Sequence, residues 1–245
     1  FCTVISAWAL ANLKRVPFVF ELRDIWPASI VAVGAMKGSW IIKVLEKLEL
    51  FLYSQADLII SVTHSFKLEL QNRGVSADKI KVVLNGVDLS KYKPLPEKDK
   101  AFAEEFQLQG KFVAGYVGTH GLAHALDSII EAAELLKAED DIRIMFVGGG
   151  ADRARLEKLV EAYDLSNVVM IPKQLKENMQ NIWSLCDVSL VSLKDTPLFS
   201  TVIPSKIFES MAMGLPIIIS VPEGESTEIV RREKLGLVIP PENPD

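Results

Sequence analysis

The sequence has 245 residues, of which 49% are hydrophobic and 24% charged, and its formal net charge is −5. A chain of this length and composition can bury one large core or two modest ones, which excludes disorder as its main state. The acidic balance argues against a nucleic-acid-binding domain, because such a domain carries a basic face that displaces phosphate counterions.

Cysteine usage and hydropathy narrow the class of protein further. Cys2 and Cys186 lie far apart and show neither CxxC nor metal-ligand spacing, so we expect no disulfide framework and no zinc site. Apolar runs stay shorter than the roughly 18 to 20 residues of a membrane span, and a signal-peptide pattern is not evident at the start. These features predict a cytoplasmic protein that is soluble or peripheral to a membrane.

The first part of the chain is predicted to be half of an α/β domain. Residues 1–17 resemble the tail of a helix that leads into a strand at 18–24, and a helix is predicted within Met36–Ser54. A strand at 57–62, a helix at 65–74 and a strand at 79–86 follow. Short β-branched runs that alternate with helical periodicity predict βαβ units and a parallel sheet. Because the opening strand and its glycine-rich turn are missing, we expect a fragment of a longer protein.

A change in composition separates two predicted domains. VDLSKYKPLPEKDK, residues 87–100, contains two prolines and many charges without apolar periodicity, which is typical of a linker. We therefore assign residues 1–90 to the second half of a first Rossmann-like domain, 91–110 to a linker with the lead into the next domain, and 111–245 to a second Rossmann-like domain.

The second domain is predicted to hold six strands that alternate with five helices. The strands are expected at 112–118, 142–148, 167–172, 187–193, 216–221 and 235–241, and the helices at about 125–137, 153–164, 177–186, 205–213 and 226–233. Nearly continuous apolar strands indicate a sheet that is covered on both faces. Right-handed crossovers then make the domain doubly wound.

The loops after the strands are where a ligand is expected, because open parallel sheets bind ligands beyond the carboxyl ends of their strands. GTHGLAH, residues 118–124, could offer backbone amides and a helix N-terminus to a diphosphate, or could be only a tight turn. VGGGADR, residues 147–153, lacks G-x-G-x-x-G spacing, which disfavours a nicotinamide cofactor. Lys173 and Gln174 could project into the same crevice. The long loop at 193–206 also favours a functional role.

The stretch PSKIFESMAMGLPIIIS, residues 204–220, places two charges at the start of an apolar helix. If the helix begins near Ser205, Lys206 and Glu209 share a face and border the crevice. A carboxylate there could accept hydrogen bonds from the vicinal hydroxyls of a ribose, and the ammonium could meet a phosphate. The alternative is a solvated helix start with a weak ion pair. The residues expected to pack on the sheet are Ile207, Phe208, Met211 and Ala212.

Several stretches together resemble the retaining GT-B glycosyltransferases of family four. NGVDLSKYKP resembles the signature at the end of the N-terminal domain, YVGTHG the first strand and turn of the C-terminal domain, PSKIFESMAMGLPIIIS the donor-site helix, and EGESTEIV the element after it. FELRDIWPASI resembles the subgroup that builds bacterial capsule, exopolysaccharide and O-antigen chains, including transferases of N-acetylated amino sugars.

The resemblance implies a GT-B-like fold with two Rossmann-like parallel-sheet domains, the first incomplete. It implies transfer of a hexosyl or N-acetylaminosugar group from a nucleoside-diphosphate sugar, most commonly linked to uridine, with retention. The acceptor would be a glycan or a lipid-linked glycan. The fold is known to work without a metal, so neither a metal nor a cofactor is expected.

The resemblance also implies roles for donor-binding residues. Glu209 matches the second glutamate of the E-x7-E motif, which binds the donor ribose. The first glutamate is replaced by Thr201, so that hydroxyl and the backbone amides of residues 199–202 become the candidates for holding the sugar. These positions predict that the donor's ribose and sugar lie beside the start of the donor-site helix.

The phosphate-binding group departs from the family pattern. Thr119, next to Gly118, stands where the family has its phosphate-binding arginine, and the usual lysine a few residues on is missing. We therefore choose Lys206, beside Ser205, as the compensating charge, with Lys173 in reserve. Fixed cations and amides at the diphosphate stabilise the departing nucleotide, so Lys206 is also predicted to be catalytic.

Other features allow two interpretations each. Asp24, in RDIWP, could bind or deprotonate the acceptor, or could form a strand-end pair with Arg23. The helix within Met36–Ser54 could lie on a membrane or cover a sheet. Its expected apolar side comprises Trp40, Ile41, Val44, Leu45, Leu48 and Leu52. His64 and His124 could be catalytic or could be ordinary turn residues.

Two rival functions are compatible with the same residues. One is a non-catalytic remnant that binds a nucleotide sugar, because Thr119 and Thr201 depart from the family pattern. The other is a GT-B-like sugar-nucleotide epimerase, which uses acidic groups and histidines around the same diphosphate. Transfer to an acceptor separates the first rival from a transferase, and isomerisation of the donor without an acceptor identifies the second.

Overall fold

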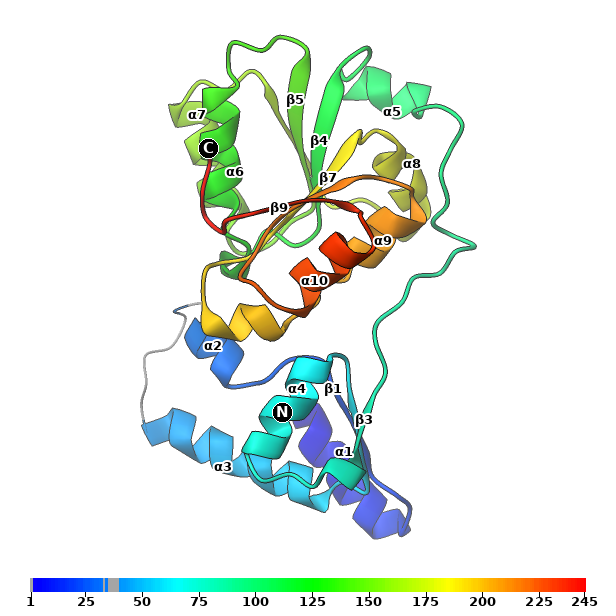
Figure 1. Cartoon of the computed structure of the whole chain (residues 1–245), viewed down its shortest axis with the longest axis vertical. Coiled ribbons are helices and arrows are strands. Elements are labelled where there is room, and N and C mark those ends of the chain that lie inside the picture. Colours follow the sequence, from blue (N-terminus) through cyan, green and yellow to red (C-terminus); the bar gives the residue numbers. More distant parts are fainter. Residues whose placement is uncertain (1, 33, 35–39) are drawn as a thin grey trace. The chain divides into compact units, whose positions relative to one another are not determined.

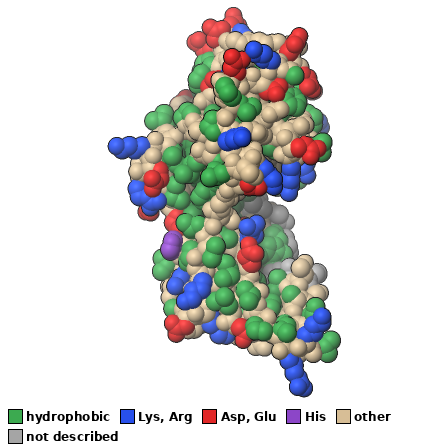
Figure 2. Space-filling model, turned by 90° about the vertical axis from the view of Figure 1, so that its right-hand side faces the viewer, with side chains coloured by type: hydrophobic (Ala, Val, Ile, Leu, Met, Phe, Trp, Pro, Cys, Tyr) green, Lys and Arg blue, Asp and Glu red, His purple; other side chains and the backbone are tan. Residues whose placement is uncertain are grey.

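The computed structural model describes residues 2–32, 34 and 40–245, and the chain divides into two compact units, Phe1–Asn85 and Gly86–Asp245. On the face drawn in Figure 2, Lys and Arg side chains are interspersed with Asp and Glu, in keeping with the small net charge of −5. Within the described ranges, no helix has both the length and the apolar character needed to cross a membrane.

The first unit is a three-stranded parallel sheet with helices (Figure 1). Its elements are α1 (Cys2–Lys14), β1 (Val19–Leu22), α2 (Ala28–Ala32), α3 (Trp40–Gln55), β2 (Leu58–Ser61), α4 (His64–Asn72), the 3₁₀ turn η1 (Ala77–Lys79) and β3 (Ile80–Val82). The strand order is β1-β2-β3, with Val19 opposite Leu58 and Ile59 opposite Ile80. Thr63 caps α4 by accepting a hydrogen bond of 3.0 Å from the Phe66 amide, which fixes where the helix begins.

The apolar side predicted for α3 packs in the fold only in part, because Leu52 is buried and Leu45 and Leu48 are half-buried, whereas Ile41 is exposed. Its buried residues are Ile42, Glu49, Leu52 and Tyr53, of which only Leu52 belongs to the predicted set. Trp40 and Val44 are exposed. The sequence pattern misled because Glu49 and Tyr53 satisfy each other inside the core, so the buried face is not the most apolar one. The part of the prediction that falls on residues 36–39 lies outside the described residues.

The second unit is a doubly wound sheet of six parallel strands. Its strands are β4 (Phe112–Val117), β5 (Ile142–Val147), β6 (Val168–Ile171), β7 (Val188–Ser192), β8 (Ile217–Ser220) and β9 (Gly236–Ile239). Its helices are α5 (Lys100–Glu105), α6 (Leu126–Leu135), α7 (Arg153–Ala162), α8 (Met179–Ser184), α9 (Lys206–Ala212) and α10 (Glu225–Arg232). The 3₁₀ turns are η2 (Leu122–His124), η3 (Lys176–Asn178) and η4 (Pro197–Thr201).

Both faces of this sheet are covered, as the continuous apolar strands predicted. Helices α6 and α7 lie on one side of the sheet and α8 and α9 on the other (Figure 1). Alternate residues of β4 enter the two cores, Val113 and Val117 on one face and Ala114 and Tyr116 on the other. The strand order β6-β5-β4-β7-β8-β9 is that of a Rossmann fold. The order reverses between β4 and β7, and ligands bind at such a switch point.

The packing predicted for α9 is wrong in part. The residues buried on this helix are Lys206, Ile207 and Ser210, whereas Met211 is 39% exposed. The buried side is therefore turned by about one residue, or about 100°, from the predicted one. Ser210 donates a hydrogen bond of 2.7 Å to Ser189 of β7, so a pair of hydroxyls occupies a contact that the hydropathy pattern assigned to apolar side chains.

Candidate functional site

A cavity of about 550 Å³ lies at the carboxyl ends of β4, β5 and β6 and at the start of α9. It is formed within the second unit, at the switch point of the sheet, where a parallel fold is expected to bind ligands. The predicted residues that line it are Gly118, Thr119, Lys173, Ser205, Lys206 and Glu209. Tertiary structure therefore gathers five separate stretches of the sequence around one space, near residues 92, 117–124, 147–149, 173–179 and 204–209.

Two glycines allow the loops after β4 and β5 to approach each other. Gly118 has φ +153° and Gly148 has φ +142°, a backbone region that favours glycine. A Cβ atom on Gly148 would lie 1.9 Å from the Gly118 carbonyl oxygen, and one on Gly118 would lie 3.3 Å from the Lys206 Nζ atom. These glycines leave room for the neighbouring loop and for the lysine.

Lys206 enters the cavity wall as a buried, unpaired ammonium. The residue is 7% exposed, and its Nζ atom lies 3.5 Å from the centroid of the Tyr116 ring. Among the residues that the structure describes, none forms a hydrogen bond with this atom. Burial lowers the pKa of Lys206 to about 7, against the opposing effect of Glu209. The Tyr116 ring stabilises the cation only in part. An anion bound in the cavity would stabilise the ammonium further.

Glu209 lies one turn along α9 and lines the same cavity. Burial raises its pKa, while Trp183 and the charge of Lys206 act in the opposite direction. The pKa of Tyr92, which also lines the cavity, is raised by burial and by the Glu209 charge. A half-buried carboxylate next to open space can accept hydrogen bonds from hydroxyl groups of a ligand.

His120 and His124 form a cluster with Tyr116 and Lys206. The sequence did not predict this cluster. Each ring centroid lies 6.0 Å from that of Tyr116. Both ring nitrogens of His120, and Nδ1 of His124, are buried without a hydrogen-bond partner in the described part of the chain. Burial is the main cause that lowers the pKa of each imidazole to about 4, and the charge of Lys206 adds to it. At neutral pH both rings are therefore uncharged, and the positive charge that acts on His120 comes from Arg153 and Lys206.

Two residues that were predicted to bind the sugar donor do not project into the cavity as expected. Lys173 is exposed at the rim of the cavity. Thr201 is not among the described residues that line it, because η4 turns its hydroxyl toward the helix itself. The Thr201 hydroxyl donates a hydrogen bond of 2.6 Å to the Leu198 carbonyl. A role for Thr201 in holding a sugar would require that bond to be exchanged.

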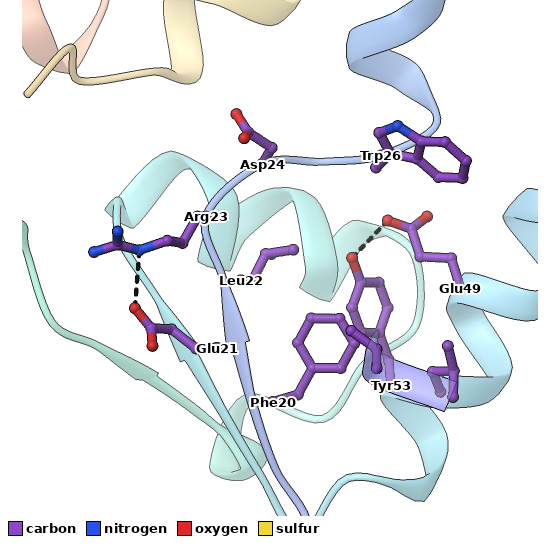
Figure 3. Close-up of a pocket in the computed structure, with 10 residues that line it drawn as sticks. Phe20, Glu21, Leu22, Arg23, Asp24, Trp26, Glu49 and Tyr53 are labelled. Atoms are coloured by element: carbon purple, nitrogen blue, oxygen red, sulfur yellow. Dashed lines mark hydrogen bonds and ion pairs between the residues drawn. The ribbon is translucent and has the colours of Figure 1, made fainter. Parts of the chain in front are cut away.

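Asp24 lies in the first unit, at the carboxyl end of β1, beside a cavity of about 250 Å³ (Figure 3). Burial raises the pKa of Asp24, and the nearby charge of Arg23 opposes that rise. Arg23 itself donates hydrogen bonds to Glu21, at 2.9 Å, and to Asn85, at 3.0 Å. The ion pair at this strand end thus joins Arg23 to Glu21. The apolar side chains that line the cavity include Phe20, Leu22, Trp26 and Leu52.

A buried carboxylate forms the floor of this second cavity. The Tyr53 hydroxyl donates a hydrogen bond of 2.5 Å to Glu49, and Arg73 forms an ion pair with the same carboxylate. Burial raises the pKa of Glu49, while both partners lower it. The spacing of Glu49 and Tyr53, four residues apart on α3, was the only trace of this pair in the sequence.

Residues 97–245 match the family described as glycosyl transferases group 1, and residues 1–91 match glycosyltransferase family 4. The chain belongs to the glycosyl transferases group 1 family. Its α/β architecture, with two Rossmann-like parts of which the first is incomplete, is GT-B-like.

Over the aligned residues, curated relatives are about a quarter identical to the chain. It is 24% identical over 229 residues to "Probable glycosyltransferase WbjE" of Pseudomonas aeruginosa, which covers 93% of the chain and 57% of WbjE. It is 25% identical over 210 residues to WcaI of Escherichia coli (strain K12), a glycosyl transferase assigned to colanic acid biosynthesis, covering 84% of the chain and 51% of WcaI. The chain thus spans about half the length of the relatives that it matches.

A solved structure with the same fold is Anabaena Alr3699/HepE in complex with UDP and glucose. It matches with a TM-score of 0.80 and 18% identity, over 98% of this chain and 62% of HepE. At this identity the match establishes the fold of the group 1 chain.

Proposed function

We propose that the chain is part of a retaining glycosyltransferase of bacterial surface-polysaccharide synthesis. The donor is a nucleoside-diphosphate sugar, linked to uridine, and the acceptor is a glycan or a lipid-linked glycan at the cytoplasmic side of the membrane. The transferred group is a hexosyl or N-acetylaminosugar residue. Neither a metal nor a further cofactor is part of the proposal.

The observation that carries this proposal is the unpaired ammonium of Lys206 beside the Glu209 carboxylate in one cavity. A nucleoside diphosphate supplies an anion for the first group and ribose hydroxyls for the second. Family membership supports the reaction class, and the UDP and UDP-glucose complexes of HepE support the choice of nucleotide. The association of WcaI with colanic acid supports a surface polysaccharide as the product.

The proposed chemistry follows the movement of charge. The bond between the anomeric carbon and the diphosphate oxygen breaks, and its electron pair leaves with the nucleotide. The sugar becomes oxocarbenium-like and is attacked by an acceptor hydroxyl on the face that the nucleotide leaves, which gives retention. Lys206 stabilises the negative charge of the leaving group, with Gly118, Thr119 and Ser205 beside the diphosphate and Lys173 in reserve.

Further roles within the proposal belong to three residues. Glu209 binds the ribose. Thr201, or the backbone of residues 199–202 around it, holds the transferring sugar after a local rearrangement of η4. Asp24 binds the acceptor hydroxyl or accepts its proton, and burial, which raises the pKa of this carboxyl, makes it a better proton acceptor.

The test is a thermal-shift screen of nucleotide sugars, followed by transfer assays with the full-length protein. A cognate nucleotide at 100 times its Kd stabilises the protein by roughly 2.7 kcal/mol. The anomeric configuration of the product, measured by NMR, distinguishes retention from inversion. Nucleotide binding without transfer or donor hydrolysis would indicate a non-catalytic remnant, and isomerisation of the donor without an acceptor would indicate an epimerase.

A further inference from the structure

Tyr116 lies behind the wall of the larger cavity and contacts the site through two different groups. The residue is fully buried in β4, and its ring belongs to the apolar core that includes Phe146. The Lys206 Nζ atom lies over the face of the ring, 3.5 Å from its centroid. The Tyr116 hydroxyl donates a hydrogen bond of 2.8 Å to the Thr119 carbonyl. One side chain therefore contacts both a lysine and a turn that line the cavity.

The face of the Tyr116 ring is a binding surface for an ammonium that lacks a hydrogen bond. Within the described residues, the Lys206 Nζ atom has no hydrogen-bond partner, so the ring and the charge of Glu209 are what favour the cation. Burial acts against both and lowers the pKa of Lys206 to about 7. The imidazoles that also act on this ammonium, His120 and His124, are uncharged at neutral pH. Charged and neutral lysine are thus nearly balanced, and a modest stabilisation of the cation changes their ratio strongly.

The hydroxyl of Tyr116 fixes the ring in its place under the ammonium. Burial raises the pKa of Tyr116 above its ordinary value, so the hydroxyl stays protonated and remains a donor to the Thr119 carbonyl. Gly118 leaves the space that this arrangement needs. A Cβ atom on Gly118 would lie 3.3 Å from the Lys206 Nζ atom and 3.9 Å from the Tyr116 hydroxyl oxygen. The ring, the turn and the lysine are therefore held against one another.

We propose that Tyr116 is a positioning residue of the donor site, whose ring face keeps Lys206 charged at the cavity and whose hydroxyl fixes the turn at Thr119. This inference rests on the proposed role of Lys206 toward the donor diphosphate. A bound diphosphate favours the ammonium form, so a neutral lysine must take up a proton when the donor binds. The ring lowers the cost of that step, and its contribution to the population of the cation is about 2- to 30-fold.

The test compares Tyr116→Phe with a variant that has 3,4,5-trifluorophenylalanine at the same position, both in the 245-residue chain. Fluorine withdraws electron density from the ring face and leaves the shape of the ring nearly unchanged, so the two variants differ mainly in their attraction for a cation. NMR titration of isotope-labelled lysine side chains identifies Lys206 as the signal missing from Lys206→Met. The proton affinity of Lys206 should be about 2- to 30-fold lower in the trifluoro variant. This measurement needs no ligand.

Binding of UDP-glucose, measured by calorimetry, tests the consequence for the donor site. The diphosphate of this probe does not titrate between pH 6 and pH 8, so a change of affinity with pH reports on the protein. At pH 8 the trifluoro variant should bind about 2- to 30-fold more weakly than Tyr116→Phe. At pH 6 the difference should be smaller, because most free Lys206 is then already charged. In a Lys206→Met background the two variants should bind equally, since the ring face has no ammonium to stabilise.

The hydroxyl is tested by comparing wild type with Tyr116→Phe. Loss of the hydrogen bond to Thr119 should weaken UDP-glucose binding about 2- to 10-fold. The loss should persist in a Lys206→Met background, because it acts on the turn and not on the lysine.

Phe146→Leu is the matched control for damage to the core. Phe146 is fully buried in the same core, and its ring centroid lies 6.1 Å from that of Tyr116. The variant should be less stable to urea, as large-to-small core substitutions are. Its UDP-glucose affinity and its Lys206 titration should stay within about twofold of wild type.

Three results would overturn the proposal. The first is the same Lys206 titration in Tyr116→Phe and in the trifluoro variant. The second is a difference in UDP-glucose affinity between these two variants that persists without the lysine, which would assign the effect to packing. The third is wild-type affinity in Tyr116→Phe, which would remove the role of the hydroxyl. Failure of wild type to bind any nucleotide sugar would instead count against the proposed function, and the titration of Lys206 would still decide the role of the ring.

Discussion

Burial of the Lys206 side chain has opposite effects on stability and on binding. Within the described part of the chain, the buried ammonium has no hydrogen-bond partner. Such a group destabilises a fold, since it loses hydration without full compensation. Such residues mark functional sites more often than structural ones. Both ring nitrogens of His120 and Nδ1 of His124 also lack a hydrogen-bond partner among the described residues, so a ligand could satisfy several buried polar atoms at once.

Replacing the lysine should therefore stabilise the protein and impair binding. We expect Lys206→Met to raise the free energy of unfolding by about 1–4 kcal/mol at pH 7, as apolar replacements of buried charges do. Because the pKa of Lys206 falls from 10.5 in its ordinary state to about 7 when folded, the unfolded chain binds the extra proton between these values. Wild-type stability thus rises with pH across that window, and the advantage of Lys206→Met should shrink.

Urea unfolding at pH 7 and pH 9 measures this difference, and calorimetry with UDP measures the lost affinity. For transfer by the full-length protein, Lys206→Ala should lower kcat by roughly 10²–10³ if the lysine is the main stabiliser of the leaving group. Near-normal turnover of that variant would remove the catalytic role. A variant that binds UDP weakly yet is no more stable than wild type would contradict the account of the buried charge.

The pH dependence of nucleotide binding should reveal the same lysine. With a pKa of about 7 in the free protein, most Lys206 side chains are neutral at pH 8, whereas a bound diphosphate favours the ammonium form. Binding should then take up nearly one proton at pH 8 and much less at pH 6. Calorimetry in two buffers with different ionisation enthalpies measures this uptake. It should disappear in Lys206→Met, and uptake that persists there would assign the proton to another group.

Glu209 can be tested through the ribose that it is proposed to bind. Glu209→Gln should weaken UDP binding about 10- to 100-fold, the usual effect of a lost hydrogen bond to a charged group. The preference of wild type for UDP over 2′-deoxy-UDP should also vanish in the variant. Glu228→Gln, on the exposed side of α10, is the control. If Glu209→Gln binds free UDP as wild type does, the ribose assignment fails.

At the scale of elements, the contact between the loops after β4 and β5 shapes the cavity. Gly148→Ala would place a methyl group 1.9 Å from the Gly118 carbonyl oxygen in a backbone conformation unfavourable to alanine. We expect a loss of stability of at least about 1–3 kcal/mol from the backbone strain alone, together with weaker nucleotide binding.

Gly149→Ala is the matched control for that prediction, because a Cβ atom there meets nothing within 4 Å. Chemical denaturation of both variants gives the comparison. Equal stabilities would mean that the two loops move apart at little cost, and the cavity wall would then be less fixed than the contact suggests.

At the scale of the whole molecule, the chain consists of two compact units, each with its own sheet. The second unit has a core on both faces of its six strands and contains all the residues that line the larger cavity. We expect residues 86–245 alone to fold cooperatively and to bind UDP within about threefold of the affinity of the 245-residue chain. Circular dichroism melting and calorimetry check this, and an unfolded product would show that the second unit depends on the first.

Local patterns in the sequence were sufficient to predict the order of elements and the class of the fold. β-branched runs separated by helical periodicity predicted the strands of both sheets, since this alternation follows from local geometry and burial. The family resemblance of PSKIFESMAMGLPIIIS and YVGTHG was confirmed at the level of the family. The roles of Glu209, Thr201 and Asp24 remain predictions.

The buried faces of the helices and the contacts between distant side chains depend on how the chain folds in three dimensions. Ser210 packs against Ser189, and Glu49 is buried with Tyr53 and Arg73, because polar groups that satisfy each other can replace apolar contacts that hydropathy predicts. Likewise, the unpaired Lys206 lies over Tyr116 only because the turn after β4 and the start of α9 converge at the switch point of the sheet. Lys206 and Tyr116 are 90 positions apart in the sequence. Their contact depends on which strands are neighbours in the sheet, and local sequence patterns do not encode that arrangement.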